Sequence, residues 1–281
     1  MTAVADAVAN DPLDLLAAYK VAERAARAAG AHLQASRSRL NAVALMRKQP
    51  GDLASEIDRE AEQLIHDVVR RAYPGHAFLG EETGRQGASA PGEPRDGDPP
   101  LWVVDPLDGT ANYLRGYPQY AVSVALVVGG EPVVGTIFDP CRNEFFAAIR
   151  GRGARLNGAA LQCADRARPI DALASTVFPK PTSPRMASYL GEFGRVLRSF
   201  GGVRRSGSMA LELAYLAAGR IDAFWEHDMG AWDAAAGIVL LREAGAGIEA
   251  RDGRPLLESR SLAASTPAMR EAFAAVLSQA G

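Results

Sequence analysis

The chain has 281 residues, 48% of them hydrophobic and 23% charged, and its formal net charge is −2 at pH 7. A chain of this length and composition forms one large globular domain or two closely packed ones. Because acidic and basic residues nearly balance and are interspersed, the composition argues against nucleic acid or an anionic membrane as a partner.

The sequence also predicts neither a membrane anchor nor a secretory leader. Its longest stretch of mainly apolar residues, 121–128, is far shorter than the roughly 20 residues that cross a bilayer. The first residues carry Asp6 and Asp11, where a signal peptide has a basic start. The two cysteines, Cys141 and Cys163, form no CxxC pair or ligand cluster. These features predict a cytoplasmic protein.

The first half of the chain predicts two helices followed by an antiparallel sheet. An alanine-rich segment with a proline in its first turn predicts a helix over about 11–30. Apolar residues at helical spacing predict a second helix over 57–72. Residues 84–100 are rich in Gly, Pro, Ser and Asp and are predicted to form a mobile loop. Residues 120–149 alternate β-prone runs with turns, which indicates an antiparallel meander.

The second half changes to a βα rhythm. The predicted strands are 174–178, 203–205, 221–225 and 247–250, and the predicted helices are 184–200, 208–218, 232–245 and 266–279. We therefore place a boundary near 151–158 and expect an N-terminal α+β domain, 1–152, and a C-terminal α/β domain, 153–281. The functional site is expected in the cleft between them.

The residues that carry most chemistry lie in 102–112, Trp-Val-Val-Asp-Pro-Leu-Asp-Gly-Thr-Ala-Asn. A buried strand is expected to deliver Asp105 to a sheet edge, where Pro106 prevents further pairing. Asp105 and Asp108 then share one short turn. Two carboxylates so close repel each other unless a divalent cation lies between them, and ligands that are all oxygen favour magnesium, manganese or calcium over zinc.

The residues after Asp108 suggest the second half of such a site. Gly109 permits a tight turn, and free backbone amides at the start of a short helix attract an anion. Carboxylates for a metal beside amides for a phosphate indicate metal-assisted phosphoryl chemistry. Taken alone, Asp108-Gly109 is also ordinary turn punctuation, which this chain repeats at Asp96-Gly97 and Asp252-Gly253.

The whole phrase 102–112 resembles the signature of the inositol monophosphatase family, a group of magnesium-dependent, lithium-sensitive phosphatases. Two further family phrases follow the family's order, Leu-Gly-Glu-Glu at 79–82 and Trp-Asp-Ala-Ala-Ala-Gly at 232–237. The flanking segments 52–58 and 139–158 are similar as well. The resemblance covers most of the chain and implies the layered αβαβα sandwich of the sugar phosphatases.

The resemblance implies two or three magnesium ions in one site. One ion would be held by Glu81, Asp105 and the carbonyl of Leu107, and another by Asp105, Asp108 and Asp233. A third, weaker ion would lie near Glu81, with support from Asp58. From the residues alone, Asp233 is equally well interpreted as a helix N-cap, and the acidic pair that begins with Glu81 as solvated.

The same resemblance implies the catalytic roles. Thr110, within reach of Glu81, would orient a water activated by the metal and help to take its proton, while the amides of Gly109 and Thr110 hold phosphate oxygens. Asp108 belongs to the catalytic set as a ligand. A rival mechanism makes Asp105 or Asp108 the nucleophile, but a carboxylate held on magnesium is a poor one.

Substrate contacts are suggested at three places. Glu226 falls where family members hydrogen-bond a polyol hydroxyl, Met209 falls near the ring, and Arg47 lies in a segment that family members fold over the site. The alternatives are that Glu226 is an exposed rim carboxylate and that Arg47 is a solvated charge.

These features predict magnesium-dependent hydrolysis of inositol 1-phosphate or a related polyol or sugar phosphate. Histidinol phosphate and fructose 1,6-bisphosphate remain alternative substrates, whereas Ala111 disfavours 3'-phosphoadenosine 5'-phosphate because relatives specific for it usually have Lys there. An alternative of another class is a binding partner of the transcription or ribosome-assembly machinery, as some bacterial relatives are. Family members commonly form homodimers, which we expect here too.

Overall fold

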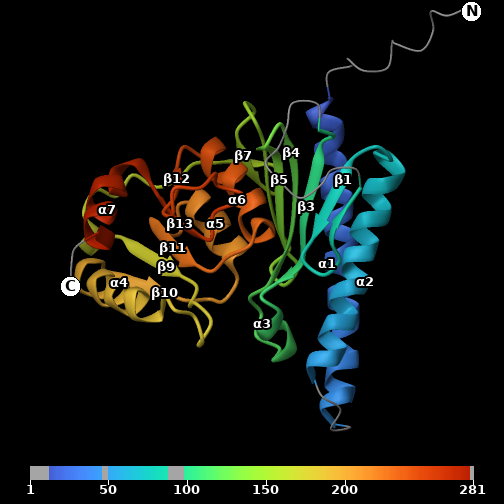
Figure 1. The fold of residues 1–281 in the computed structure, drawn as a ribbon, viewed down its shortest axis with the longest axis horizontal. Helices are drawn as coiled ribbons and strands as arrows, with labels where there is room; N and C mark the ends of the chain where they lie inside the picture. The colour runs from blue at the N-terminus through green and yellow to red at the C-terminus, as the bar shows by residue number, and fades with distance from the viewer. Residues whose placement is uncertain (1–12, 46–49, 88–97, 279–281) are drawn as a thin grey trace, which may run out of the picture.

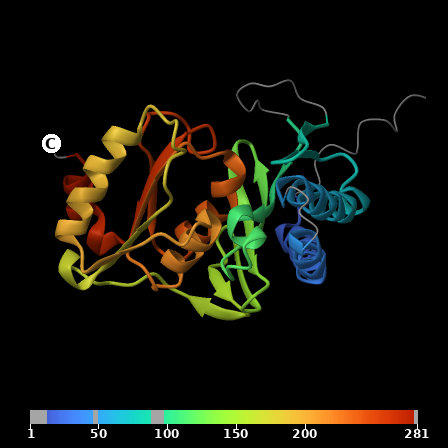
Figure 2. The ribbon, with the colours of Figure 1, turned by 90° about the horizontal axis from the view of Figure 1, so that it is seen from below.

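The computed structural model describes residues 13–45, 50–87 and 98–278. The described residues form five layers, in which a pair of helices, a sheet, a second pair of helices, a second sheet and a third pair of helices are stacked in that order (Figures 1 and 2). This arrangement confirms the expected αβαβα sandwich. Within the described ranges, no helix is long and apolar enough to span a membrane.

The outer layer on one side consists of α1 (Leu15–Leu45) and α2 (Pro50–Ala72), which pack on each other and on the first sheet. The helix predicted over 11–30 thus continues fifteen residues further, and its predicted start lies outside the described residues. Gly30 does not end α1; it lies inside the helix, where α1 packs against the first sheet. A Cβ at Gly30 would lie 2.6 Å from the ring of Phe138, so only glycine lets α1 approach the sheet this closely.

The first sheet has eight strands in the order β2-β1-β3-β4-β5-β6-β7-β8. Its strands are β1 (Ala77–Gly80), β2 (Gly84–Gln86), β3 (Leu101–Asp108), β4 (Ala121–Val128), β5 (Glu131–Asp139), β6 (Glu144–Ile149), β7 (Ala154–Leu156) and β8 (Ala159–Leu161). The pairing of β4, β5 and β6 confirms the antiparallel meander. One pair departs from the expectation of an antiparallel sheet, because β1 and β3 run parallel. The chain leaves β1 through β2, which is antiparallel to it, and so returns in the original direction for β3.

The second sheet has the order β10-β9-β11-β13-β12. Its strands are β9 (Leu173–Thr176), β10 (Gly202–Arg204), β11 (Ala223–His227), β12 (Gly247–Ala250) and β13 (Ser261–Ser265), and its helices are α4 (Met186–Ser199), α5 (Met209–Ala217), α6 (Ala231–Glu243) and α7 (Arg270–Ser278). Short 3₁₀ turns, η1 (Pro169–Asp171) and η2 (Pro267–Met269), precede β9 and α7. The βα rhythm is confirmed, but β13 was not expected. The proposed division at 152/153 stays a prediction, while the first sheet itself extends to Leu161.

Helices α5 and α6 form the central layer between the two sheets, and α4 and α7 cover the outer face of the second sheet (Figure 2). The central layer is thin because α6 presents alanines and a glycine. Ala236 lies against Gly135 of β5, and Gly237 lies against Leu213 of α5. This close approach brings the first turn of α6 beside the end of β3.

We expect Gly135→Ala to destabilise the protein. Its new Cβ would lie 2.4 Å from the carbonyl oxygen of Ala236, which belongs to the backbone and cannot turn aside. Overpacking of this kind costs about 1 to 3 kcal/mol, to be measured by urea unfolding. Gly75→Ala is the matched control, because nothing lies within 4 Å of a Cβ there. Equal stability of the two variants would contradict the proposed packing of α6 on β5.

Candidate metal centre

The end of β3 brings Asp105 and Asp108 to the same side of the sheet. Asp105 pairs with Ser123 of β4 and Asp108 with Ala121, so three steps along β3 match two along β4. Residues three apart in a regular strand point to opposite faces, and the extra residue of this bulge reverses that relation. The Leu107 amide donates to Asp105 Oδ1 at 2.9 Å, which fixes the turn.

A third carboxylate reaches the same place from α6. Ligand oxygens of Asp105, Asp108 and Asp233 all lie within 4.8 Å of one another. Asp233 stands in the first turn of α6, where its Oδ2 also accepts the Gly230 amide at 2.6 Å. Asp233 is therefore not the N-cap of α6, which is Gly230, but it stands at the third position of the helix, binds the amide of that cap residue and joins the cluster.

Glu81 and Asp58 border this cluster. Glu81 follows β1, and its carboxyl group lies close enough to that of Asp105 for each to affect the pKa of the other. Asp58 lies on α2 and is buried, and its Oδ1 has no hydrogen-bond partner among the described residues. An orphaned carboxylate oxygen beside an acidic cluster is the position expected for a bound ion or its water.

The electrostatics of the protein atoms alone strongly disfavour ionisation of the cluster. Burial, followed by the charges of Glu81, Asp108 and Asp233, raises the pKa of Asp105 well above its usual value. Burial and the charge of Asp233 raise the pKa of Asp108 to about 7, although Ser208 and Ala210 donate hydrogen bonds to it.

The bordering groups are shifted in the same direction. Burial raises the pKa of Asp233 to about 6. The Gly230 amide and the positive charges of Arg260 and Lys180 act in the opposite direction and limit this rise. Glu81 is open to solvent on one side, yet lost hydration and then the charge of Asp233 raise its pKa to about 7. Burial and nearby glutamates raise the pKa of Asp58 to about 8.

These shifts indicate what the cluster can hold. Carboxylates that repel one another in a buried place become stable when a divalent cation neutralises them. The converging donors are oxygen only, without histidine or cysteine among the three clustered residues, which suits a hard ion such as magnesium. The residues therefore fit the expected metal.

Thr110 and Gly109 follow directly on the chain. Gly109 has φ of 92°, and a Cβ there would lie 3.0 Å from the carbonyl oxygen of Gln119, so both conformation and space require glycine. Thr110 begins the short helix α3 (Thr110–Leu114). Its hydroxyl donates to the Leu107 carbonyl at 3.0 Å, and its expected proximity to Glu81 stays a prediction.

Asp108 has a second role that the sequence did not reveal. Its Oδ2 accepts the Ser208 hydroxyl and, at 2.8 Å, the Ala210 amide, and its Oδ1 accepts the Met209 amide at 3.3 Å. The carboxylate thereby caps α5 from another element, where an anion is favoured by the helix dipole. Asp108 thus connects the first sheet to the central helices.

The three residues suggested as substrate contacts lie in different surroundings. Glu226 at the end of β11 is only 7% exposed and its Oε2 has no described partner, so the alternative of an exposed rim carboxylate was wrong. Burial and the charge of Asp233 raise its pKa well above the usual value. Met209 buries its side chain in the core between the sheets. Arg47 lies outside the described residues.

Glu62 is the nearby acidic residue that sequence reasoning missed. It is 1% exposed and accepts hydrogen bonds from the backbone of Glu82 and Thr83. The signal was available, since Glu62 follows Ala61 on the face of α2 that Ile57 and Ile65 bury. A carboxylate on an apolar helix face is seldom buried without a specific partner.

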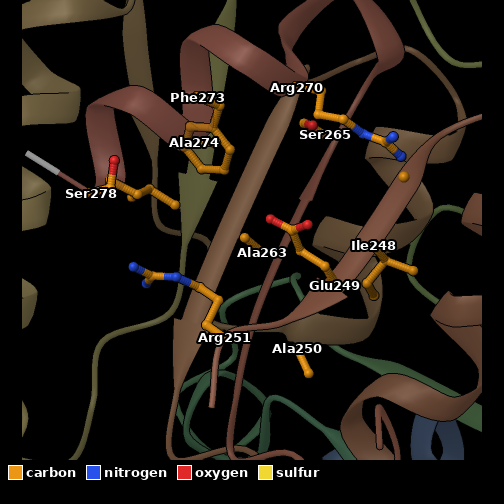
Figure 3. A pocket seen from close by; sticks show the side chains of 12 residues that line it. Ile248, Glu249, Ala250, Arg251, Ala263, Ser265, Arg270, Phe273, Ala274 and Ser278 are labelled. Atoms are coloured by element: carbon orange, nitrogen blue, oxygen red, sulfur yellow. The ribbon is translucent and has the colours of Figure 1, made fainter. Parts of the chain in front are cut away.

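A groove elsewhere is distinct from this cluster. It has a volume of about 270 Å³ and lies between edge strand β12 and α7, where Arg251, Glu249 and Arg270 are among the residues that line it (Figure 3). Arg251 also belongs to a buried network, donating to Glu192 at 2.8 Å while Glu192 pairs with His227 at 2.9 Å. None of the clustered aspartates lines the groove.

Residues 14–281 match the family model of the inositol monophosphatase family. The chain belongs to this family. It is 43% identical over 227 residues to Nus factor SuhB of Pseudomonas aeruginosa, covering 80% of this chain and 82% of that protein. It is 38% identical over 258 residues to inositol-1-monophosphatase of Mesorhizobium japonicum, covering 92% and 94%. The inositol monophosphatase of Anabaena sp. PCC 7120 superimposes with a TM-score of 0.81 at 34% identity, over 96% of this chain and 98% of that one.

The raised pKa values predict how stability depends on pH without metal. An aspartate ordinarily has a pKa of 3.8, but Asp108 and Asp233 retain protons in the folded chain up to about pH 7 and 6. Between about pH 4 and 8 the folded state therefore binds more protons than the unfolded state, and stability falls as pH rises. We expect the melting temperature in chelator to be lower at about pH 8 than at about pH 5.

Saturating magnesium is the control for that measurement. A cation favours the ionised carboxylates, so magnesium should raise the melting temperature most at the higher pH and flatten the decline. A melting temperature that rises toward pH 8 in chelator would contradict the electrostatic account of the cluster.

Proposed function

We propose that the protein is a magnesium-dependent phosphatase that hydrolyses a phosphate monoester of a small polyol or sugar, with inositol 1-phosphate as the foremost substrate. The observation that carries the proposal is the convergence of Asp105, Asp108 and Asp233 within 4.8 Å in a largely buried place. Membership of the family supports the reaction class, and relatives named inositol-1-monophosphatase support the substrate.

In this proposal the carboxylates hold two or three magnesium ions. Glu81, Asp105 and the Leu107 carbonyl would hold one ion, and Asp105, Asp108 and Asp233 would hold another. Asp58 supports a third near Glu81. When bound, magnesium supplies the Lewis acidity that activates water and neutralises charge on the transferring phosphoryl group.

The remaining chemistry is assigned to Thr110, Gly109 and Glu81. Because the Thr110 hydroxyl donates its hydrogen bond to the Leu107 carbonyl, its oxygen lone pairs are left to accept a hydrogen bond from the attacking water. Glu81 is the acceptor of the water's proton, and the amides of Gly109 and Thr110 bind phosphate oxygens.

The rival mechanism through an aspartyl nucleophile is disfavoured for Asp108. Both of its oxygens already accept hydrogen bonds from the start of α5, which stabilises the carboxylate and restricts its rotation. A carboxylate that is hydrogen-bonded in this way and shared with a cation is a weak nucleophile.

Glu226 supports a hydroxyl-bearing substrate. A buried carboxylate oxygen without a partner is costly, and a hydroxyl group of a bound polyol would satisfy it. We assign Met209 and Arg47 to the substrate region only by family resemblance. Histidinol phosphate and fructose 1,6-bisphosphate are the competing esters, since they also combine a phosphate with donors for Glu226.

The second candidate function is a binding role in transcription, which is raised by the relatives named Nus factor SuhB. The balanced charge of this chain favours a protein partner over nucleic acid. Because each acidic residue of the proposed metal site is present, we rank catalysis first. The two roles are compatible.

We also expect the protein to form a homodimer. Helix α4 exposes Leu190 and Leu197, which lie two turns apart on one helix face and are 57% and 51% exposed, and Phe178 nearby is 46% exposed. Large apolar side chains that are grouped on a surface are typical of an association surface.

The first test is phosphate release by purified protein with magnesium. We expect hydrolysis of inositol 1-phosphate above histidinol phosphate, fructose 1,6-bisphosphate and 3'-phosphoadenosine 5'-phosphate, and inhibition by lithium. Chelator provides the blank. Preference for another ester of the panel would reassign the substrate, and release from none of them would remove the phosphatase proposal and leave the transcription role.

The second test is Asp108→Asn. Loss of one charged ligand should reduce magnesium-dependent turnover at least about 100-fold. This is a larger loss than is typical when a residue that only supports a metal ligand is changed. The fold should survive, because asparagine keeps an oxygen for the Ala210 amide and removes one repelling charge. Circular dichroism and melting in chelator check the fold. Asp171→Asn, at an exposed aspartate paired with Arg168, is the control; near wild-type turnover of Asp108→Asn would remove Asp108 from the site.

A further inference from the structure

Glu62 lies on α2 beneath the turn that follows β1, and no part of the reaction described so far uses it. Its side chain is almost fully buried, with 1% exposed. A carboxylate in such a place must have its oxygens satisfied or it destabilises the fold.

Three hydrogen bonds join this carboxylate to the turn after β1. Oε2 accepts the Glu82 amide at 3.0 Å, and Oε1 accepts the Thr83 amide at 3.0 Å and the Thr83 hydroxyl at 2.5 Å. All three are donated by two consecutive residues. Hydrogen bonds to an ionised carboxylate are stronger than neutral ones, so this contact holds the turn firmly.

The residue before Glu81 is adapted to the same contact. An added Cβ at Gly80 would lie 2.2 to 2.5 Å from the carboxylate atoms of Glu62. Gly80 is not in the left-handed region, so lack of space, rather than backbone conformation, requires glycine. The carboxylate of Glu62 therefore lies directly against the backbone of the Gly80–Thr83 turn.

Glu81 is fixed between these contacts. Its own amide donates to the Val104 carbonyl of β3 at 3.2 Å, and the residues on either side of it contact Glu62. The backbone of Glu81 is thus held by β3 on one side and by α2 on the other. Its carboxyl group lies close enough to that of Asp105 for each to affect the pKa of the other.

We propose that Glu62 is the positioning residue of the metal centre, holding the turn after β1 so that the Glu81 carboxylate meets Asp105 at the ion. The inference rests on the proposed metal site and names a residue outside its ligand shell. It assigns Glu62 no contact with substrate or metal.

Packing alone does not account for a carboxylate at this position. The face of α2 around it is already filled by Ile57, Ala61 and Ile65, which pack with Phe78 of β1. Glu62 also adds negative charge beside Asp58, Glu81 and Glu82, which raises the pKa of each of them. If this position served only to join α2 to β1, an uncharged side chain would do so without repelling the neighbouring carboxylates.

The test is magnesium binding by the full-length, metal-free protein, measured by calorimetry with magnesium chloride. In Glu62→Gln one oxygen becomes an amide nitrogen that faces backbone N–H groups, so the turn loses an acceptor. We expect the dissociation constant for magnesium to rise about 10-fold or more, as is typical when a residue that orients a ligand is altered. The maximal rate should recover at high magnesium while the half-saturating magnesium concentration shifts.

Two further variants separate positioning from folding. Glu60→Gln changes a half-buried glutamate of α2 that pairs with Arg39 and His32 rather than with the turn after β1, and should leave magnesium affinity within about twofold of wild type. Thr83→Val, at an exposed residue, removes the hydroxyl that donates to Glu62 and also accepts from Gln86 Nε2 at 2.7 Å, but it keeps both backbone amides that bind Glu62. It should weaken magnesium binding less than Glu62→Gln, in the same direction. If Glu62→Gln does not fold, Thr83→Val decides the question.

The outcomes distinguish this inference from the proposed function. Wild-type affinity for magnesium in the folded Glu62→Gln, or in Thr83→Val where Glu62→Gln does not fold, would overturn the positioning role, even if stability in chelator falls. A wild-type protein that binds magnesium but hydrolyses no ester would sink the phosphatase proposal while leaving the role of Glu62 standing. A wild-type protein that binds no magnesium would overturn both.

Discussion

The mutual repulsion of carboxylates gathered in a buried place is the constraint around which the rest of the structure is organised. Asp105, Asp108 and Asp233 converge within 4.8 Å, and Glu81 lies close enough to Asp105 for each to affect the pKa of the other. Such a group is unfavourable without a cation, so the surrounding elements must hold it together against its own charge. The bulge in β3, the first turn of α6 and the cap on α5 each fix one side chain of the group.

The layered architecture makes this convergence possible. The acids come from the turn after β1, from β3 and from α6, and α6 can lie beside β3 only because alanine and glycine keep the central layer thin. Asp108 adds a direct connection, since it accepts hydrogen bonds from the first turn of α5. The chemistry and the packing of the two sheets therefore depend on the same few contacts, which is common where function is held on rigid elements.

Sequence reasoning recovered the layers, the meander, the βα half and the acidic phrases, because periodicity and family motifs are local signals. It ended the first helix near Gly30, because the sequence alone does not distinguish a glycine that ends a helix from one inside a helix that packs against a sheet, as Gly30 packs against Phe138. It missed β13, whose Ser-Leu-Ala-Ala-Ser lacks β-branched and aromatic residues and is a strand because its neighbours bury it. Ser208 and Glu62 were missed because their partners lie 100 and 20 residues away.

The order of the strands in the second sheet bears on how the acidic cluster forms while the chain is being synthesised. Its strand β13 lies between β11 and β12 although it is the last strand made, so the sheet cannot close until residues 261–265 have been added. Asp233 belongs to a helix that packs on this sheet and is itself made long after Asp108. A chain still emerging from the ribosome consequently has the first two aspartates without the third. In the proposed metal site, the three aspartates can therefore converge on an ion only after α6 has been made and has packed beside β3.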